Sequence, residues 1–199
     1  MALTKVQADG INLADTFAFT GTVSGSGMNL LLNTTISSPV SEYDISSTYI
    51  NSTYDSYYLD AYFLPSTDNV YLNAHVFVGG TAQSGSIYGN EVQRVGGTYG
   101  GANSNASTSI IQANSAQIGN QAGEGITISM NMQNTNNTSV GFCVSGISNW
   151  YFTDGNHNAS TFAGGLIVAN RANVVNGFRF IMSSGNIESG TVKLYGLRT

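Results

Sequence analysis

Apolar and polar residues alternate along several stretches of this chain, and a period of two residues is typical of β-strands. The clearest alternation has Ile126, Ile128, Met130 and Met132 separated by polar residues. One face of this strand is therefore expected to be buried and the other solvated. Weaker alternation predicts further strands at 57–64, 70–78, 178–182 and 191–194. No stretch of ten residues has the period of 3.6 that predicts an amphipathic helix.

Turn signals separate these predicted strands at intervals of roughly 8–12 residues, a spacing typical of all-β sandwiches and barrels. The segment 65–69 combines Pro, Ser, Thr, Asp and Asn between two strands, and Gly-containing pairs recur further along the chain. We expect eight to ten strands between residues 43 and 199, arranged as a jelly-roll-like antiparallel β-sandwich. The Gly-, Asn- and Ser-rich stretch 96–123 fits both a long surface loop and a pair of strands.

Residues 1–40 have a different composition. Phe17, Phe19 and Val23 lie in a stretch rich in Gly, Ser and Thr, which ends at Gly25-Ser26-Gly27. About 40 residues of this kind predict a short extended arm rather than a second domain. We therefore divide the chain into an N-terminal attachment arm, 1–40, and a β-sandwich domain, 41–199. The three apolar residues are the candidate attachment residues of the arm.

Charge is scarce: the 199 residues include six Lys and Arg and eleven Asp and Glu, for a net charge of −5. A nucleic-acid partner is not expected, because neutralising phosphates requires clustered basic residues. Apolar runs are too short to cross a bilayer, so membrane insertion is not expected either. No secretory signal is visible, and the single Cys143 excludes an intramolecular disulfide, which together predict folding in a reducing cytoplasm.

Few residues suggest catalysis. His75 lies in an alternating strand and is expected to be partly buried and hydrogen-bonded, while His157 lies in a predicted turn. The acidic pairs that could hydrolyse a glycoside are Glu42 with Asp44 and Asp55 with Asp60, which are more simply solvated surface groups. No nucleophile elbow or zinc-ligand spacing is present. We predict no enzymatic activity, no catalytic residue, no cofactor and no metal site.

Aromatic residues are the more suggestive feature. Seven Tyr fall between residues 43 and 71, and Trp150 begins a second cluster. Such side chains suit sugar stacking or a subunit interface, although many are expected to belong to the core. The candidate ligand-binding residues are Tyr58, Tyr62, Trp150 and Tyr151. Because the sheet surface carries few charges, we favour an oligomer interface over a sugar site.

Two segments resemble small virion structural proteins of tailed bacteriophages. The first is 57–86, with Leu-Pro-Ser-Thr-Asp-Asn-Val-Tyr-Leu at its centre, and the second is 175–197, with Ser-Ser-Gly-Asn-Ile before a closing Gly-Thr-Val-Lys-Leu-Tyr-Gly strand. The opening Met-Ala-Leu-Thr-Lys-Val is similar to the N-termini of phage appendage proteins. The resemblance brings no known catalytic or ligand residue with it.

This resemblance implies a β-sandwich protein of the virion, made in the host cytoplasm and usually assembled as a homotrimer. Its partners would be other virion proteins, namely the major capsid protein or a tail protein. The chain lacks shaft repeats and heptads, which favours a capsid decoration or cement protein. The alternative is a tail-fibre or receptor-binding tip that recognises a host surface glycan.

Overall fold

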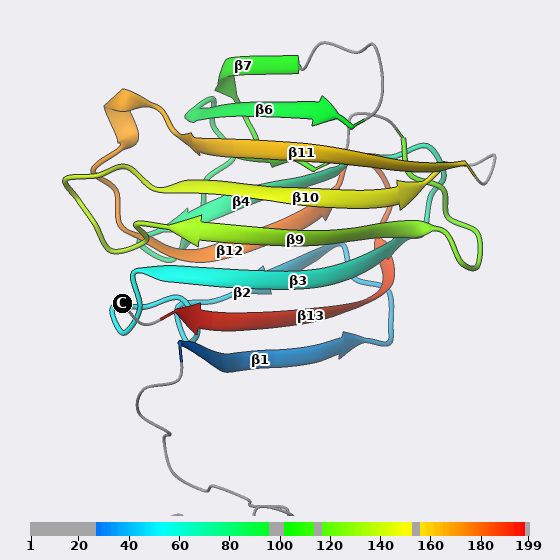
Figure 1. Ribbon diagram of the computed structural model, residues 1–199, viewed down its shortest axis with the longest axis horizontal. Coiled ribbons are helices and arrows are strands. Elements are labelled where there is room, and N and C mark those ends of the chain that lie inside the picture. Colours follow the sequence, from blue (N-terminus) through cyan, green and yellow to red (C-terminus); the bar gives the residue numbers. More distant parts are fainter. Residues whose placement is uncertain (1–26, 96–101, 114–116, 153–155, 198–199) are drawn as a thin grey trace, which may run out of the picture.

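The computed structural model describes residues 27–95, 102–113, 117–152 and 156–197, and it builds them into two antiparallel β-sheets (Figure 1). The larger sheet has eight strands in the order β1-β13-β3-β9-β10-β11-β6-β7. Its strands are β1 (Met28–Ile36), β3 (Ser56–Pro65), β6 (Tyr88–Arg94), β7 (Ala102–Ser107), β9 (Gly125–Gln133), β10 (Cys143–Tyr151), β11 (His157–Leu166) and β13 (Ile187–Leu197).

The smaller sheet has the order β2-β12-β4-β5 and lies behind the larger one in Figure 1. Its strands are β2 (Glu42–Ile45), β4 (Leu72–Val78), β5 (Thr81–Ala82) and β12 (Val175–Met182), and β8 (Ile111–Gln112) also pairs with β4. A single 3₁₀ turn, η2 (Val168–Asn170), lies between β11 and β12. The predicted all-β, two-sheet architecture is confirmed, whereas the jelly-roll order of strands stays a prediction. Short strands such as β5 and β8 raise the described number above the eight to ten expected.

The inner faces of the two sheets form one hydrophobic core, as the alternation predicts. Ile126, Ile128, Met130 and Met132 of β9 are at most 1% exposed, while the residues between them are exposed. The rings of Phe63 in β3 and Phe180 in β12 lie 5.1 Å apart, so the sheets make direct contact. Burial of such large side chains is the main stabilising term of the fold.

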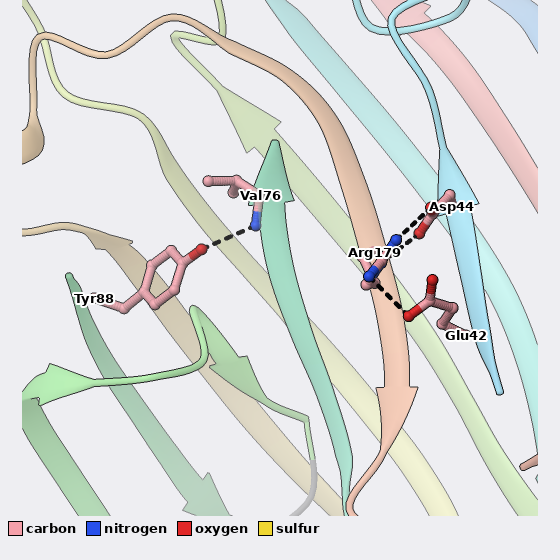
Figure 2. Close-up of polar contacts among 5 residues, drawn as sticks. All are labelled: Glu42, Asp44, Val76, Tyr88 and Arg179. Atoms are coloured by element: carbon pink, nitrogen blue, oxygen red, sulfur yellow. Dashed lines mark hydrogen bonds and ion pairs between the residues drawn. The ribbon is translucent and has the colours of Figure 1, made fainter. Parts of the chain in front are cut away.

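One polar contact also joins the sheets. The hydroxyl of Tyr88 in β6 accepts a hydrogen bond from the backbone N–H of Val76 in β4, at 3.1 Å (Figure 2). The same hydroxyl donates to the carbonyl of Gln83 at 2.7 Å. Burial raises the pKa of Tyr88 to about 12, so the hydroxyl keeps its proton at neutral pH.

The predicted arm is too long at its C-terminal end. Residues 28–36, which fall within the predicted 1–40 arm, form strand β1 and pair antiparallel with β13. The physical reason is that Ile36 is buried, and Leu31 and Leu32 pack against the core, so this stretch is part of the sandwich. Phe17, Phe19 and Val23 lie outside the described residues.

The described parts of the undecided 96–123 stretch include strand structure. Residues 102–107 form β7 at the edge of the larger sheet, and residues 111–112 form β8 beside β4. Ile118 forms an isolated bridge with Val70. The stretch therefore contributes to both sheets.

Candidate functional site

Three of the four aromatic candidates, Tyr58, Tyr62 and Tyr151, lie on the outer face of the larger sheet. In β3, Tyr58 and Tyr62 alternate with buried residues, and both are half-buried. The ring of Tyr58 lies 6.1 Å from the ring of Tyr195 in β13. Tyr62 donates a hydrogen bond to the carbonyl of Glu124 at 2.7 Å, so its polar tip is already occupied.

The fourth candidate, Trp150, does not join them. Trp150 is only 1% exposed, because the alternation of β10 turns it toward the core, opposite Ile126 and Asn158. It is therefore not available for stacking on a ligand, contrary to the sequence prediction. Tyr151 is 41% exposed, and its ring contacts that of His157 at 5.4 Å. The structure does not gather the four aromatic side chains into one sugar platform.

An exposed apolar surface instead lies at the β1 edge of the larger sheet. Met28 and Leu30 are 47% and 54% exposed. The register places Leu30 opposite Tyr195, which in turn lies opposite Tyr58. We call these four residues the β1 corner. Strand β1 ends the described order of the larger sheet, and its nine residues contain no charged side chain and no Pro. Edge strands of this kind readily pair with other chains.

The charged side chains of Glu42, Asp44 and Arg179 on the smaller sheet form ion pairs with one another. Arg179 in β12 binds the carboxylate of Asp44 through two contacts of 2.7 Å, and it binds Glu42 at 2.7 Å (Figure 2). The hydrogen bonds that Arg179 donates to Asp44 raise the pKa of Arg179. Its guanidinium also lies 5.3 Å from the ring centre of Phe77. The Glu42–Asp44 pair, considered above for hydrolysis, is thus held by an ion pair. Asp60 of the second pair lies opposite Lys193.

A polar depression of about 400 Å³ lies beside this ion pair, over strand β4. Asn73 and His75 of β4 line it, together with Ile181 and Ser183 at the end of β12 and the turn 107–109. We call it the His75 trough. His75 is half-buried and hydrogen-bonded to the backbone of Thr108, as the sequence analysis expects. Burial is the main cause that lowers the pKa of His75, and nearby Arg179 lowers it further, so the imidazole is neutral at pH 7.

A second, shallower depression of about 570 Å³ crosses β9, β10, β11 and β6 on the outer face of the larger sheet. It exists because Gly89 and Ala163 have little or no side chain there. Cys143 and Gln133 line one end, with Sγ 3.7 Å from Oε1. Burial raises the pKa of the Cys143 thiol, so the thiol is protonated and unreactive at neutral pH.

Comparison with known proteins adds no relative to this description: no family model, no curated protein and no solved structure matches the chain. Within the described ranges, no three His, Cys, Asp or Glu side chains come close enough to hold a metal ion. The same part of the chain contains no helix of the length and apolarity needed to span a membrane.

Several site residues escaped sequence reasoning. Met28 and Leu30 fall within the predicted arm, because the three consecutive Leu of β1 hide its alternation. The wall of the His75 trough comes from residues 107–109, which lie 32 to 36 positions away from Asn73 and His75 in a stretch without apolar alternation. No local signal could have placed that turn over β4.

Proposed function

We propose that this protein is a non-enzymatic structural protein of the bacteriophage particle surface, most simply a capsid decoration or cement protein, and that it self-associates through the β1 corner. The observation that carries the proposal is the uncharged edge strand β1, with Met28 and Leu30 exposed beside Tyr58 and Tyr195. Hydrophobic patches beside an unpaired strand edge are typical of surfaces that another chain covers.

Charge distribution supports this choice of interface. A net charge of −5 opposes contact between copies of the chain, and the repulsion is weakest where no charged residue lies. Residues 28–36 satisfy that condition, since none of them is charged. Attachment to the shell then falls to the residues that precede β1, and the homotrimer and the contact with a major capsid or tail protein follow from the sequence resemblance.

The first experiment measures the mass of the full-length protein in solution by light scattering. A trimer has about three times the 20.9 kDa of one chain. Leu30→Lys should give a monomer, because it places three like charges in the contact, whereas Ile147→Lys, which alters an equally exposed apolar residue on β10, should not. A monomeric wild type, or an unchanged assembly in Leu30→Lys, would refute self-association through this edge.

The second experiment locates the protein on phage particles by antibody labelling and electron microscopy. Label distributed over the capsid supports decoration, whereas label only at the tail supports the alternative, a receptor-binding tip that recognises a host glycan. Deletion of residues 2–25, which leaves β1 intact, should preserve the fold and abolish particle attachment. Attachment of the truncated protein at the wild-type level would contradict the role given to this segment.

A further inference from the structure

The His75 trough has preformed walls. Ser109 fastens the turn 107–109 to β4, because its Oγ accepts the backbone N–H of Ala74 at 2.9 Å. The N–H of Ile110 donates to the carbonyl of Ala74 at 2.9 Å. From the other side, Asn90 donates to the Oγ of Ser107 at 2.9 Å and to the carbonyl of Ser109 at 2.8 Å. A site held this rigidly needs little ordering when a ligand binds.

The lining of the trough is polar but uncharged. The described side chains that line it are carboxamides, hydroxyls, one imidazole, and the apolar Ile181 and Met182. The nearest charges belong to the Arg179 ion pair, in which both carboxylates are already bound. A charged ligand would therefore lose its hydration without gaining an opposite charge.

His75 provides both kinds of hydrogen-bonding atom. Its hydrogen bond to the backbone of Thr108 favours the protonated ring, which means that the imidazole donates in this contact. A neutral imidazole has one donor nitrogen and one acceptor nitrogen, so the second nitrogen is left as an acceptor. The carboxamide of Asn73 adds a donor and an acceptor on the same strand.

We propose that the His75 trough binds a neutral saccharide unit. Sugar hydroxyls donate and accept hydrogen bonds, as the carboxamide, imidazole and hydroxyl groups of the lining require, and the C–H face of a sugar ring can pack on Ile181. The volume of about 400 Å³ lies within the roughly 300–1,000 Å³ typical of small-molecule sites. The inference does not rest on the particle location proposed above, because it concerns a different face from the β1 corner.

The test is an NMR titration of the isotope-labelled full-length protein with the methyl glycosides of glucose, galactose, mannose and rhamnose and with N-acetylglucosamine. We expect saturable shifts of the Asn73, His75 and Ser183 signals with at least one of these sugars. Asn73→Ala should weaken that binding at least ten-fold. The control Asn131→Ala removes an exposed carboxamide from the outer face of the larger sheet and should bind as the wild type does.

Three results would overturn the proposal: no saturable shift at the trough with any of the sugars, equal affinity in wild type and Asn73→Ala, or tighter binding of inorganic sulfate than of every sugar. Each result is independent of the assembly and particle experiments. A monomeric protein absent from particles can still bind a sugar, and a decoration protein can fail to do so.

Discussion

Replacing Tyr88 by Phe removes a single oxygen atom from the interior of the sandwich and leaves the ring in place. Tyr88 is fully buried, and its hydroxyl is the partner of the Val76 N–H on the edge of β4 (Figure 2). Val76 is itself fully buried, so water cannot replace the lost hydroxyl without entering the core. The variant therefore leaves one buried backbone donor without a partner.

The expected loss of stability is the free-energy cost of leaving the Val76 N–H without a hydrogen-bond partner. A buried polar group that loses its partner costs about 1–3 kcal/mol. The ring volume is conserved, which keeps the packing term small, and the Gln83 carbonyl is only partly buried, so it adds little. For a domain of this size, 1 kcal/mol corresponds to about 2–4 °C in Tm. We expect Tyr88→Phe to lower Tm by about 2–12 °C.

Urea unfolding followed by circular dichroism measures the free energy of unfolding, and Tyr58→Phe is the matched control. Tyr58 lies half-buried on the outer face, where water can solvate its hydroxyl, so its loss should change stability by less than about 0.5 kcal/mol. The two variants delete the same atom in different surroundings. Equal stabilities of Tyr88→Phe and Tyr58→Phe would show that the contact between Tyr88 and Val76 contributes nothing to the pairing of the sheets.

Three further predictions test the core, a close backbone contact and a titrating group. Met130→Asp should unfold the domain, because an unpaired carboxylate on the fully buried inner face of β9 costs several kcal/mol. The control Asn131→Asp, on the exposed face of the same strand, should leave the thermal melt unchanged. A folded Met130→Asp protein would contradict the face assignment. Gly164→Ala should lower the free energy of unfolding in urea by about 1–3 kcal/mol, since the new methyl group would collide with the backbone oxygen of Ile110. An unchanged urea midpoint would mean that the segment around Ile110 moves aside freely. Burial lowers the pKa of His75 below its ordinary value of 6.5, so on acidification the unfolded chain binds a proton at a higher pH than the folded protein does. The contribution of neutral His75 to the free energy of unfolding is therefore present above about pH 6.5 and is lost as the pH falls through the folded-state pKa. His75→Gln should remove this part of the pH dependence, and identical profiles for both proteins between about pH 5.5 and pH 7.5 would refute it.

Strands with regular alternation could be predicted from the sequence because burial enforces a period of two. From Ile126 to Gln133 in β9 and from Phe178 to Met182 in β12, each buried residue is large and apolar and alternates with a more exposed one. The buried face of these strands can be predicted without knowing which strands lie beside them, because the same face points inward whichever strand is the neighbour. His75 in β4 is half-buried and hydrogen-bonded, as the sequence analysis expects.

Elements whose pattern depends on their neighbours could not be predicted in this way. Strand β1 carries three consecutive Leu, and a register shift between Leu30 and Leu32 hides its alternation. Strand β7 reads Ala-Asn-Ser-Asn-Ala-Ser and has no apolar face at all, so only its pairing with β6 makes it a strand. Trp150 is a ligand candidate in the sequence but buried in the structure, because an aromatic cluster alone does not reveal which of its members face inward in β10.

The side of β4 in the smaller sheet is covered by other segments, whereas the edge of β1 in the larger sheet is not, and this difference links the fold to the proposed assembly. Along β4, the carbonyls of Leu72, Ala74 and Val76 accept hydrogen bonds from Ala113, Ile110 and Gln83 at 2.9 Å each. The N–H groups of Ala74 and Val76 donate to the hydroxyls of Ser109 and Tyr88. Short segments and two hydroxyls thus close this edge against other strands, and the same turn that closes it forms the wall of the His75 trough. Strand β1 has no such cover among the described residues. Its exposed side chains are the apolar Met28 and Leu30 and the uncharged Asn33 and Thr35, rather than the charged ones that usually protect an edge. The covered side of β4 and the uncharged edge of β1, with Met28 and Leu30 exposed, together favour β1 as the edge through which copies of the chain associate.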